Sequence, residues 1–394
     1  MSRILLVTIA LRGRSGTEVV SYETAHGLRK RGHDVYLFTH ITGPLAEKLR
    51  ADGFPIFTDL AALSSVPDVI QSNQSDQLLD AVAKFPDVPV ISICHDASTW
   101  WSEPVDLPSI RRHVAVDLAC HARIVDRIPE LAEPVELLHN AVDLDRFLLR
   151  SPLPERPKRA LILAKQGSNY LDSVQAACLR CAIDVDAVGA TIGNEIDNLP
   201  ARLPEYDLVF ATARSALEAM AIGCAVIVVD GRGLSGLVTR DVVSSWRDNN
   251  FGAWLLSRPI SADAIGGEID RYDPSDARKV SDYIRKHSSL DRYLDRLEEM
   301  YRNVISQGLV APVGNDMWLS RMNQAFRLLT TLERAAREAE VVRERAAREV
   351  EVAHERAAER AAMEAEFKAS FQAYQESMQL GRRIRGKIKS LLTR

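Results

Sequence analysis

The chain of 394 residues is long enough for two medium-sized domains and an additional segment. Its hydrophobic content of 46% is ordinary for a soluble protein, and no apolar run reaches the roughly 18 residues that a membrane-spanning helix requires. A net charge of -4 argues against a dedicated nucleic-acid-binding protein, and five cysteines, an odd number, favour reduced thiols in a cytoplasm.

The N-terminal residues predict a βαβ unit. Residues 3–10 form an apolar run typical of a buried strand, residues 18–31 have the periodicity of an amphipathic helix, and residues 35–39 form the next strand. The connecting loop, RGRSGTE, has neither the GxGxxG of a dinucleotide-binding site nor the lysine of a P-loop. This loop is therefore not predicted to bind a dinucleotide or to act as a P-loop.

The alternation of strand and helix continues beyond this unit. Residues 68–71 and 88–93 are apolar strands separated by a helical segment, so the first domain is predicted to be a doubly wound sheet. His95 follows the second of these strands, at the carboxyl end where such sheets bind ligands. Trp100 and Trp101 follow on the same loop, and they are predicted either to stack on a sugar ring or to form a partly buried aromatic pair.

A stretch rich in proline and charge, SPLPERPKR, marks a domain boundary. It begins at residue 151, shortly after the segment VELLHNAVDLDRF at residues 135–147. We therefore predict a first domain at residues 1–150 and a second at residues 151–310. The second domain opens with an apolar strand at residues 160–164 that is followed by Lys165.

The clearest functional signal lies at residues 206–230, YDLVFATARSALEAMAIGCAVIVVD, which indicate a strand, a loop, a helix capped by Gly223 and another strand. The loop aims backbone N–H groups and the positive end of the helix beyond the strand, where anions collect. Arg214 adds a positive charge there, and Glu218 places a carboxylate beside it. This arrangement predicts a phosphate near Arg214 and a pair of sugar hydroxyls near Glu218.

The segment ATARSALEAMAIGCAVIVVD resembles the donor site of GT-B glycosyltransferases, specifically the large retaining family 4. Members of that family carry two glutamates eight positions apart; the second matches Glu218, whereas Phe210 stands in place of the first. Residues 135–147 resemble the connection between the family's domains. The resemblance implies an α/β fold with two Rossmann-like doubly wound domains facing across a cleft, with the acceptor side at residues 1–150 and the nucleotide-sugar donor side at residues 151–310.

The resemblance also implies roles for individual residues. His95 would contact the transferred sugar, and Lys165 would bind the donor diphosphate, although the family's Gly-Arg pair before it is missing. Gly16 would let the backbone approach the donor phosphate or the acceptor, or would serve only a tight turn. The implied catalytic residues are His95, Lys165 and Glu218, and the implied donor-binding residues are Gly16, Lys165, Thr212, Ala213, Arg214, Ser215 and Glu218.

The predicted function is transfer of a sugar from a nucleotide-diphosphate sugar to a glycan or lipid-linked acceptor, in bacterial surface polysaccharide assembly. The leaving phosphate gains negative charge, which Lys165, Arg214 and the helix N-terminus would stabilise without a metal or a cofactor. Two alternatives remain: a nucleotide-sugar epimerase of the same fold, and a catalytically weak scaffold.

Residues 231–236 match GxGxxG, but polar, broken sequence follows them, so we interpret them as a flexible loop facing the cleft rather than an NAD site.

The C-terminal part differs in kind. Residues 320–380 predict a long helical coiled-coil extension, since Ala, Glu and Arg dominate and small apolar residues recur at spacings of four and three. The sequence leaves two alternatives for this segment: self-association through residues 328–368, or a single helix exposed to solvent. Residues 381–394 form a basic amphipathic tail, so residues 380–394 predict binding to an anionic membrane surface. The protein is therefore expected in the cytoplasm, with peripheral attachment at the inner face of the membrane.

Overall fold

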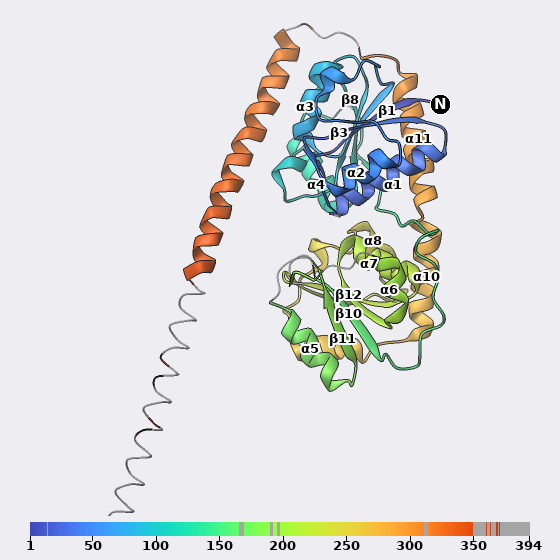
Figure 1. Ribbon diagram of the computed structural model, residues 1–394, viewed down its shortest axis with the longest axis vertical. Coiled ribbons are helices and arrows are strands. Elements are labelled where there is room, and N and C mark those ends of the chain that lie inside the picture. The colour runs from blue at the N-terminus through green and yellow to red at the C-terminus, as the bar shows by residue number, and fades with distance from the viewer. Residues whose placement is uncertain are drawn as a thin grey trace, which may run out of the picture. The chain divides into compact units, whose positions relative to one another are not determined.

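The computed structural model describes residues 1–13, 15–131, 133–164, 169–189, 192–194, 198–310, 314 and 316–349, together with residues 360, 363, 368 and 370. The chain divides into two compact units, Met1–Leu329 and Thr330–Arg394. The first unit contains two separate, largely parallel sheets, each covered by helices (Figure 1). The predicted α/β class is confirmed.

The first sheet has seven parallel strands in the order β5-β3-β1-β6-β7-β8-β9. Along β1, Ile4 and Leu6 pack in the core shared with α1, α2 and α4, whereas Leu5 and Val7 pack in the core shared with α3. Both faces of the sheet are therefore buried, as is typical of parallel sheets. The elements are β1 (Arg3–Val7), α1 (Gly16–Lys30), β3 (Asp34–Phe38), α2 (Pro44–Ala51), β5 (Ile56–Phe57), β6 (Val69–Ser72), α3 (Ser75–Lys84), β7 (Val90–Cys94), β8 (Ile110–Ala115), α4 (Leu118–Arg127) and β9 (Glu136–Leu137), with a small parallel pair β2 (Ala10–Leu11) and β4 (Ile41–Thr42) beside them.

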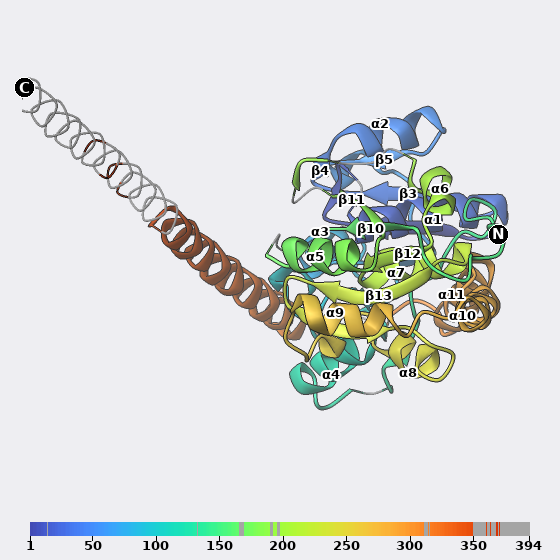
Figure 2. The ribbon, with the colours of Figure 1, turned by 90° about the horizontal axis from the view of Figure 1, so that it is seen from below.

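The second sheet has five strands in the order β11-β10-β12-β13-β14, of which only β14 is antiparallel to its neighbour. One face packs against α7 and α10, and the other packs against α5 and α9, which lie together (Figure 2). The elements are β10 (Arg159–Leu163), α5 (Leu171–Arg180), β11 (Asp184–Val188), α6 (Leu199–Arg202), β12 (Leu208–Ala211), α7 (Ala213–Ile222), β13 (Ala225–Asp230), β14 (Gly233–Leu237), α8 (Val243–Asp248), α9 (Ala262–Ile269) and α10 (Pro274–His287).

Strand β14 corrects one prediction. The glycine-rich residues 231–236 were expected to form a flexible loop, but Gly233 and Gly236 lie in an edge strand that pairs with β13. A Cβ atom on Gly233 would lie 2.6 Å from the carbonyl oxygen of Leu256, and one on Gly236 would lie 2.7 Å from the carboxylate of Glu268. The glycines therefore allow neighbouring groups to approach the strand closely.

Helix α11 (Leu290–Ser306) follows the second sheet in the chain but packs on the first. Its apolar face is buried in the core that contains Ile4 and Leu6 of β1. Arg31, at the end of α1, donates to Asp295 at 2.6 Å and to Glu298 at 2.8 Å. The buried residues of α11 are Tyr293, Leu294, Leu297, Met300, Tyr301 and Val304.

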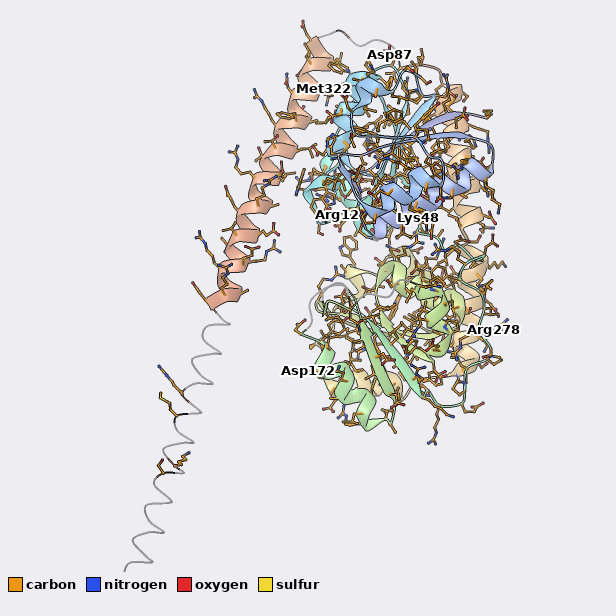
Figure 3. All side chains as sticks on the ribbon, viewed as in Figure 1. Arg12, Lys48, Asp87, Asp172, Arg278 and Met322 are labelled. Atoms are coloured by element: carbon orange, nitrogen blue, oxygen red, sulfur yellow. The ribbon has the colours of Figure 1, made fainter. Side chains whose placement is uncertain are left out.

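A further helix runs through residues 316–349. Ala325 and Leu329 are buried against the α3 side of the first sheet, and Trp318 and Met322 pack beside them (Figure 3). The predicted coiled-coil seam lies partly beyond residue 349, and the basic tail at residues 380–394 lies outside the described residues, so neither prediction is tested. Within the described part of the chain, helices long and apolar enough to cross a membrane are absent.

Candidate functional site

The turn between β12 and α7 has the geometry of a helix N-terminus at the carboxyl end of a parallel strand. Thr212 is the N-cap residue, with extended backbone, and Ala213 has a φ of 51°, a strained value for a residue with a Cβ atom. The N–H of Ala213 donates to the carbonyl oxygen of Phe251 at 2.9 Å. At the other end of the helix, Gly223 adopts a left-handed φ of 103°, which confirms its predicted C-cap position.

Arg214 and Glu218 lie side by side on the first turns of α7, but neither is free. Arg214 Nε donates to Glu218 Oε1 at 2.8 Å, and Arg214 Nη2 donates to Glu23 Oε2 on α1 at 2.5 Å. The side chains of Glu23, Arg214 and Glu218 are only 3%, 7% and 9% exposed. Three ionised groups, two of them predicted donor ligands, therefore form one buried cluster.

The cluster changes the interpretation of Arg214. Burial opposes the charged form of Arg214, but its two carboxylate partners outweigh burial and raise the pKa of the guanidinium. Burial also raises the pKa of Glu23, against the opposing charge of Arg214. Because two carboxylates already balance the charge of Arg214, the side chain does not offer the unpaired positive charge that the sequence analysis expected for a phosphate.

A second charged group lies at the end of the neighbouring strand β13. Asp230 accepts hydrogen bonds from Thr212 Oγ1 at 3.2 Å and from Arg232 Nε and Nη2 at 3.0 and 2.5 Å. These hydrogen bonds raise the pKa of Arg232, and the carboxylate of Asp96, after β7 of the first sheet, adds to the shift. The charge of Asp96, on the first sheet, therefore acts on Arg232 of the second sheet. The sequence analysis saw Arg232 only as part of a glycine motif and missed it as a cation of this site.

His95 stands at the end of β7 with a defined hydrogen-bond partner. Its Nε2 lies 3.2 Å from Asn73 Oδ1, while the Asn73 amide donates to Ser21 Oγ at 3.0 Å. Ser21 Oγ itself donates to a backbone carbonyl, so it accepts from Asn73, and the Asn73 oxygen must accept from His95. Burial lowers the pKa of His95 to about 4, against the charge of Asp96. At neutral pH the imidazole is uncharged, carries its proton on Nε2 and keeps Nδ1 as an acceptor.

Behind His95, a chain of hydrogen bonds reaches α11. Gln71 Nε2 donates to Asn73 Oδ1 at 3.1 Å, and the hydroxyl of Tyr301 donates to Gln71 Oε1. All three side chains are buried. The helix that follows the second sheet thus supports the residue that orients His95.

The glycine loop after β1 is occupied by one of its own side chains. Glu18 Oε1 accepts from the N–H groups of Arg12 and Gly13 at 2.7 and 3.0 Å, and Glu18 Oε2 accepts from that of Ser15 at 2.8 Å. Burial opposes ionisation, but these bonds outweigh it and lower the pKa of Glu18. Among the described residues, the space beside Gly16 is open, since no atom lies within 4 Å of the position of its Cβ.

The other predicted residues are Trp100, Trp101, Ser215 and Lys165. Trp100 and Trp101 form a 3-10 turn whose rings meet edge to face at 5.8 Å, and both are partly exposed. Ser215 is nearly buried on the first turn of α7. Lys165 lies outside the described residues, so its predicted role is not tested. Clusters of side chains suited to hold a metal ion are absent from the part of the chain that the structure describes.

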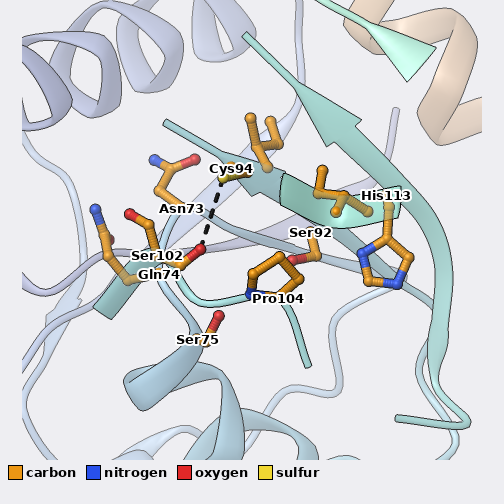
Figure 4. A pocket seen from close by; sticks show the side chains of 10 residues that line it. Asn73, Gln74, Ser75, Ser92, Cys94, Ser102, Pro104 and His113 are labelled. Atoms are coloured by element: carbon orange, nitrogen blue, oxygen red, sulfur yellow. Dashed lines mark hydrogen bonds between the residues drawn. The ribbon is translucent and has the colours of Figure 1, made fainter. Parts of the chain in front are cut away.

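A small cavity lies beside the carboxyl end of β7 (Figure 4). Asn73, Ser92, Cys94 and His113 are among its lining residues, and the Cys94 thiol donates to the Ser102 carbonyl at 3.6 Å beside it. Its volume of about 10 Å³ is that of a single water site. The cavity is too small for a sugar or a nucleotide.

Comparison with known proteins gives one family and several structures. Residues 14–146 match the model of Glycosyltransferase Family 4. The crystal structure of Anabaena HepE in complex with UDP-glucose is similar with a TM-score of 0.56 and 14% identity, over 77% of this chain and 100% of that chain. A glycosyltransferase from Rickettsia africae is similar with a TM-score of 0.55 and 14% identity, over 77% and 98%. No curated protein sequence matches the chain.

These likenesses establish the GT-B glycosyltransferase fold and confirm the resemblance to family 4. The family match covers residues 14–146, whereas the segment that first indicated the family lies at residues 211–230. The two sheets therefore point to the same family through different residues. Retention of the anomeric configuration stays a prediction.

Proposed function

We propose, from a GT-B glycosyltransferase fold that matches family 4 in its first part, that the protein transfers a hexosyl group from a nucleotide-diphosphate sugar to a glycan or lipid-linked acceptor, with retention. The observation that carries this proposal is the ion pair of Arg214 and Glu23, which joins the start of α7, at the carboxyl end of β12, to α1 on the first sheet. Ligands of doubly wound sheets bind at such ends. A donor held there would have its sugar between the two sheets.

Glu218 is proposed to bind the ribose hydroxyls of the donor. Its Oε1 is engaged by Arg214, which orients the carboxylate and leaves Oε2 to accept hydrogen bonds. Thr212, Ala213 and Ser215 supply the helix N-terminus on which a phosphate would rest. We assign the stabilisation of the leaving diphosphate to Lys165 and Arg232, because the charge of Arg214 is already balanced by carboxylates.

The first sheet is proposed to bind the transferred sugar and the acceptor. The neutral imidazole of His95 would accept a hydrogen bond from a sugar hydroxyl through Nδ1, since Asn73 takes the proton on Nε2. Gly16 leaves open space next to this region for the approach of a substrate. Trp100 and Trp101 are proposed to stack on an acceptor sugar. No metal or other cofactor is assigned a step.

The biological setting is proposed from the family and the C-terminal sequence. We assign the protein to bacterial surface polysaccharide assembly in the cytoplasm, attached peripherally to the inner face of the membrane through residues 380–394. Residues 328–368 are proposed to self-associate. Light scattering of the full chain, compared with a chain ending at Leu329, tests self-association, and vesicles with and without anionic lipid test the attachment.

A calorimetric screen of UDP, GDP and ADP, followed by the matching sugar nucleotides, tests the activity. UDP is the first choice because HepE was crystallised with UDP-glucose.

Incubation with the sugar nucleotide alone separates a transferase from an epimerase, since only an epimerase would yield an isomeric sugar nucleotide without an acceptor. A chain ending at Leu329 separates a transferase from a scaffold: it keeps the residues packed on the first sheet, so a transferase would retain turnover on a soluble acceptor. Absence of nucleotide binding would refute the proposal.

A further inference from the structure

The carboxylate of Glu23 is held by arginines from two other parts of the chain. Arg214 Nη2, on α7, donates to Glu23 Oε2 at 2.5 Å, and Arg146 Nη1, in the connection between the sheets, donates to Glu23 Oε1 at 3.3 Å. Glu23 itself lies on α1, which packs on the first sheet. One carboxylate therefore links the first sheet to the connection and to the second sheet.

The same guanidinium also holds Glu218. Arg214 Nε donates to Glu218 Oε1 at 2.8 Å while its Nη2 is engaged by Glu23. A guanidinium is planar, so fixing the direction of one donor restricts the directions of the others. The orientation of the Glu218 carboxylate thus depends on Glu23, which lies 191 residues from Arg214 in the chain.

We propose that Glu23 is a positioning residue of the donor site, which holds Glu218 through Arg214 in the orientation that binds the donor ribose. This inference rests on the proposed function of Glu218. It also assigns Arg214 a new role: it transmits the position of α1 to the nucleotide site and does not bind phosphate.

The burial of the cluster supports this assignment. With exposed fractions of 3%, 7% and 9%, the three side chains are screened little by solvent, so a lost partner is not replaced by water at low cost. Among the described residues, removal of the Glu23 charge would leave Arg214 with Glu218 as its only anionic partner. The guanidinium would then turn toward Glu218, and the carboxylate would lose its orientation.

The test is a double-mutant cycle on nucleotide affinity, measured by calorimetry with whichever of UDP, GDP and ADP the full-length wild-type protein binds. Glu23→Gln, Arg214→Gln and the double variant are compared. We expect Glu23→Gln to raise the Kd about tenfold and the double variant to bind no more weakly than Arg214→Gln, because Glu23 acts only through Arg214. In steady-state kinetics the KM for the donor should rise while kcat changes less than about twofold, as expected when binding is lost equally in the ground and transition states.

Asp248→Asn is the matched control. Asp248 on α8 lies 3.3 Å from Nε2 of His139, in the connection after β9, so it also links the two parts of the fold, but it does not touch Glu218. Its loss should leave the Kd unchanged. If Glu23→Gln does not fold, Glu23→Asp replaces it in the test. Its side chain keeps the charge but is one methylene shorter, so this variant should also raise the Kd.

The outcomes separate the inference from the function on which it rests. If the wild type binds a nucleotide and Glu218→Ala weakens binding, but Glu23→Gln binds normally, the positioning role is wrong while the donor site stands. Effects of Glu23 and Arg214 that multiply in the double variant would also overturn it. A wild type that binds none of the three nucleotides overturns both.

Discussion

His95 Nε2 and Asn73 Oδ1 meet at 3.2 Å, and the hydrogen bonds of Asn73 to Ser21 and Gln71 leave no ambiguity about which of the two donates. Asn73, which follows the neighbouring strand β6, thereby holds His95 in one tautomer. The side chain is available to a substrate through its other nitrogen, Nδ1.

The first prediction concerns the charge of His95. Because burial lowers its pKa to about 4, the ring should show no titration between pH 5.5 and 8 in histidine NMR spectra. The unfolded chain, with a pKa near 6.5, binds more protons than the folded chain between about pH 4 and 6.5. The free energy of unfolding should therefore fall as the pH is lowered through this range.

His113 provides the necessary comparison, since burial also lowers its pKa to about 4. His139 and His287 also have a lowered pKa, so His95→Gln removes only one of several such groups, and the acid loss of stability should become smaller without disappearing. An NMR titration of His95 with a midpoint near 6.5 would contradict the buried environment described above.

The second prediction concerns Arg232. Arg232→Gln should lower kcat/KM for the donor about tenfold, because a cation next to the leaving phosphate is lost. Arg258→Gln is a matched control: both arginines are 45% exposed and pair at 2.5 Å with a buried carboxylate, but Arg258 pairs with Glu268, on α9. The control should keep the wild-type kcat/KM. Equal kcat/KM values for the two variants would remove Arg232 from the donor site.

The third prediction concerns Glu218 itself. Glu218→Ala should lower turnover of a nucleotide sugar at least about tenfold, since charge-assisted hydrogen bonds contribute roughly 1.5 to 3 kcal/mol each. Steady-state assays at saturating acceptor measure the effect, and thermal melts check that the variant is folded. Full activity in a folded variant would remove the proposed ribose contact.

The fourth prediction concerns the ends of β10 and β11. A Cβ atom at Gly189 would lie 2.0 Å from the carbonyl oxygen of Ala164, and the residue has a φ of 149°. Gly189→Ala should therefore lower the free energy of unfolding by about 1 to 3 kcal/mol. Gly267→Ala, in α9 with no described atom within 4 Å, should instead raise it by about 0.5 to 1 kcal/mol. Denaturant titration compares the two.

The fifth prediction concerns the helix at residues 316–349. Leu329 is 2% exposed and packs on the α3 side of the first sheet, so Leu329→Ala should cost about 2 to 5 kcal/mol. Leu319 lies on the same helix but is 51% exposed, and Leu319→Ala should change stability by less than about 0.5 kcal/mol. Similar melting temperatures for the two variants would show that this part of the helix does not pack on the sheet in solution.

Much of the secondary structure follows from local sequence. The apolar runs that became β1, β7, β12 and β13 and the helical periodicity of α1 were recognisable, because buried strands and amphipathic helices repeat at short, known spacings. Strand β14 was missed because its glycines are poor strand formers, and its pairing with β13 depends on neighbours such as Leu256 that local sequence does not place.

The sequence alone indicated the alternation of strands and helices, the resemblance to family 4 and the residues at the ends of β7 and β12, since these depend on periodicity and on motifs within about thirty residues. The tertiary structure decided which charged side chains are available to a ligand. Glu23 balances Arg214 from 191 residues away, and the charge of Asp96, on the other sheet, acts on Arg232. The charge that a ligand meets depends on every group within a few ångströms, and only the folded chain brings those groups together.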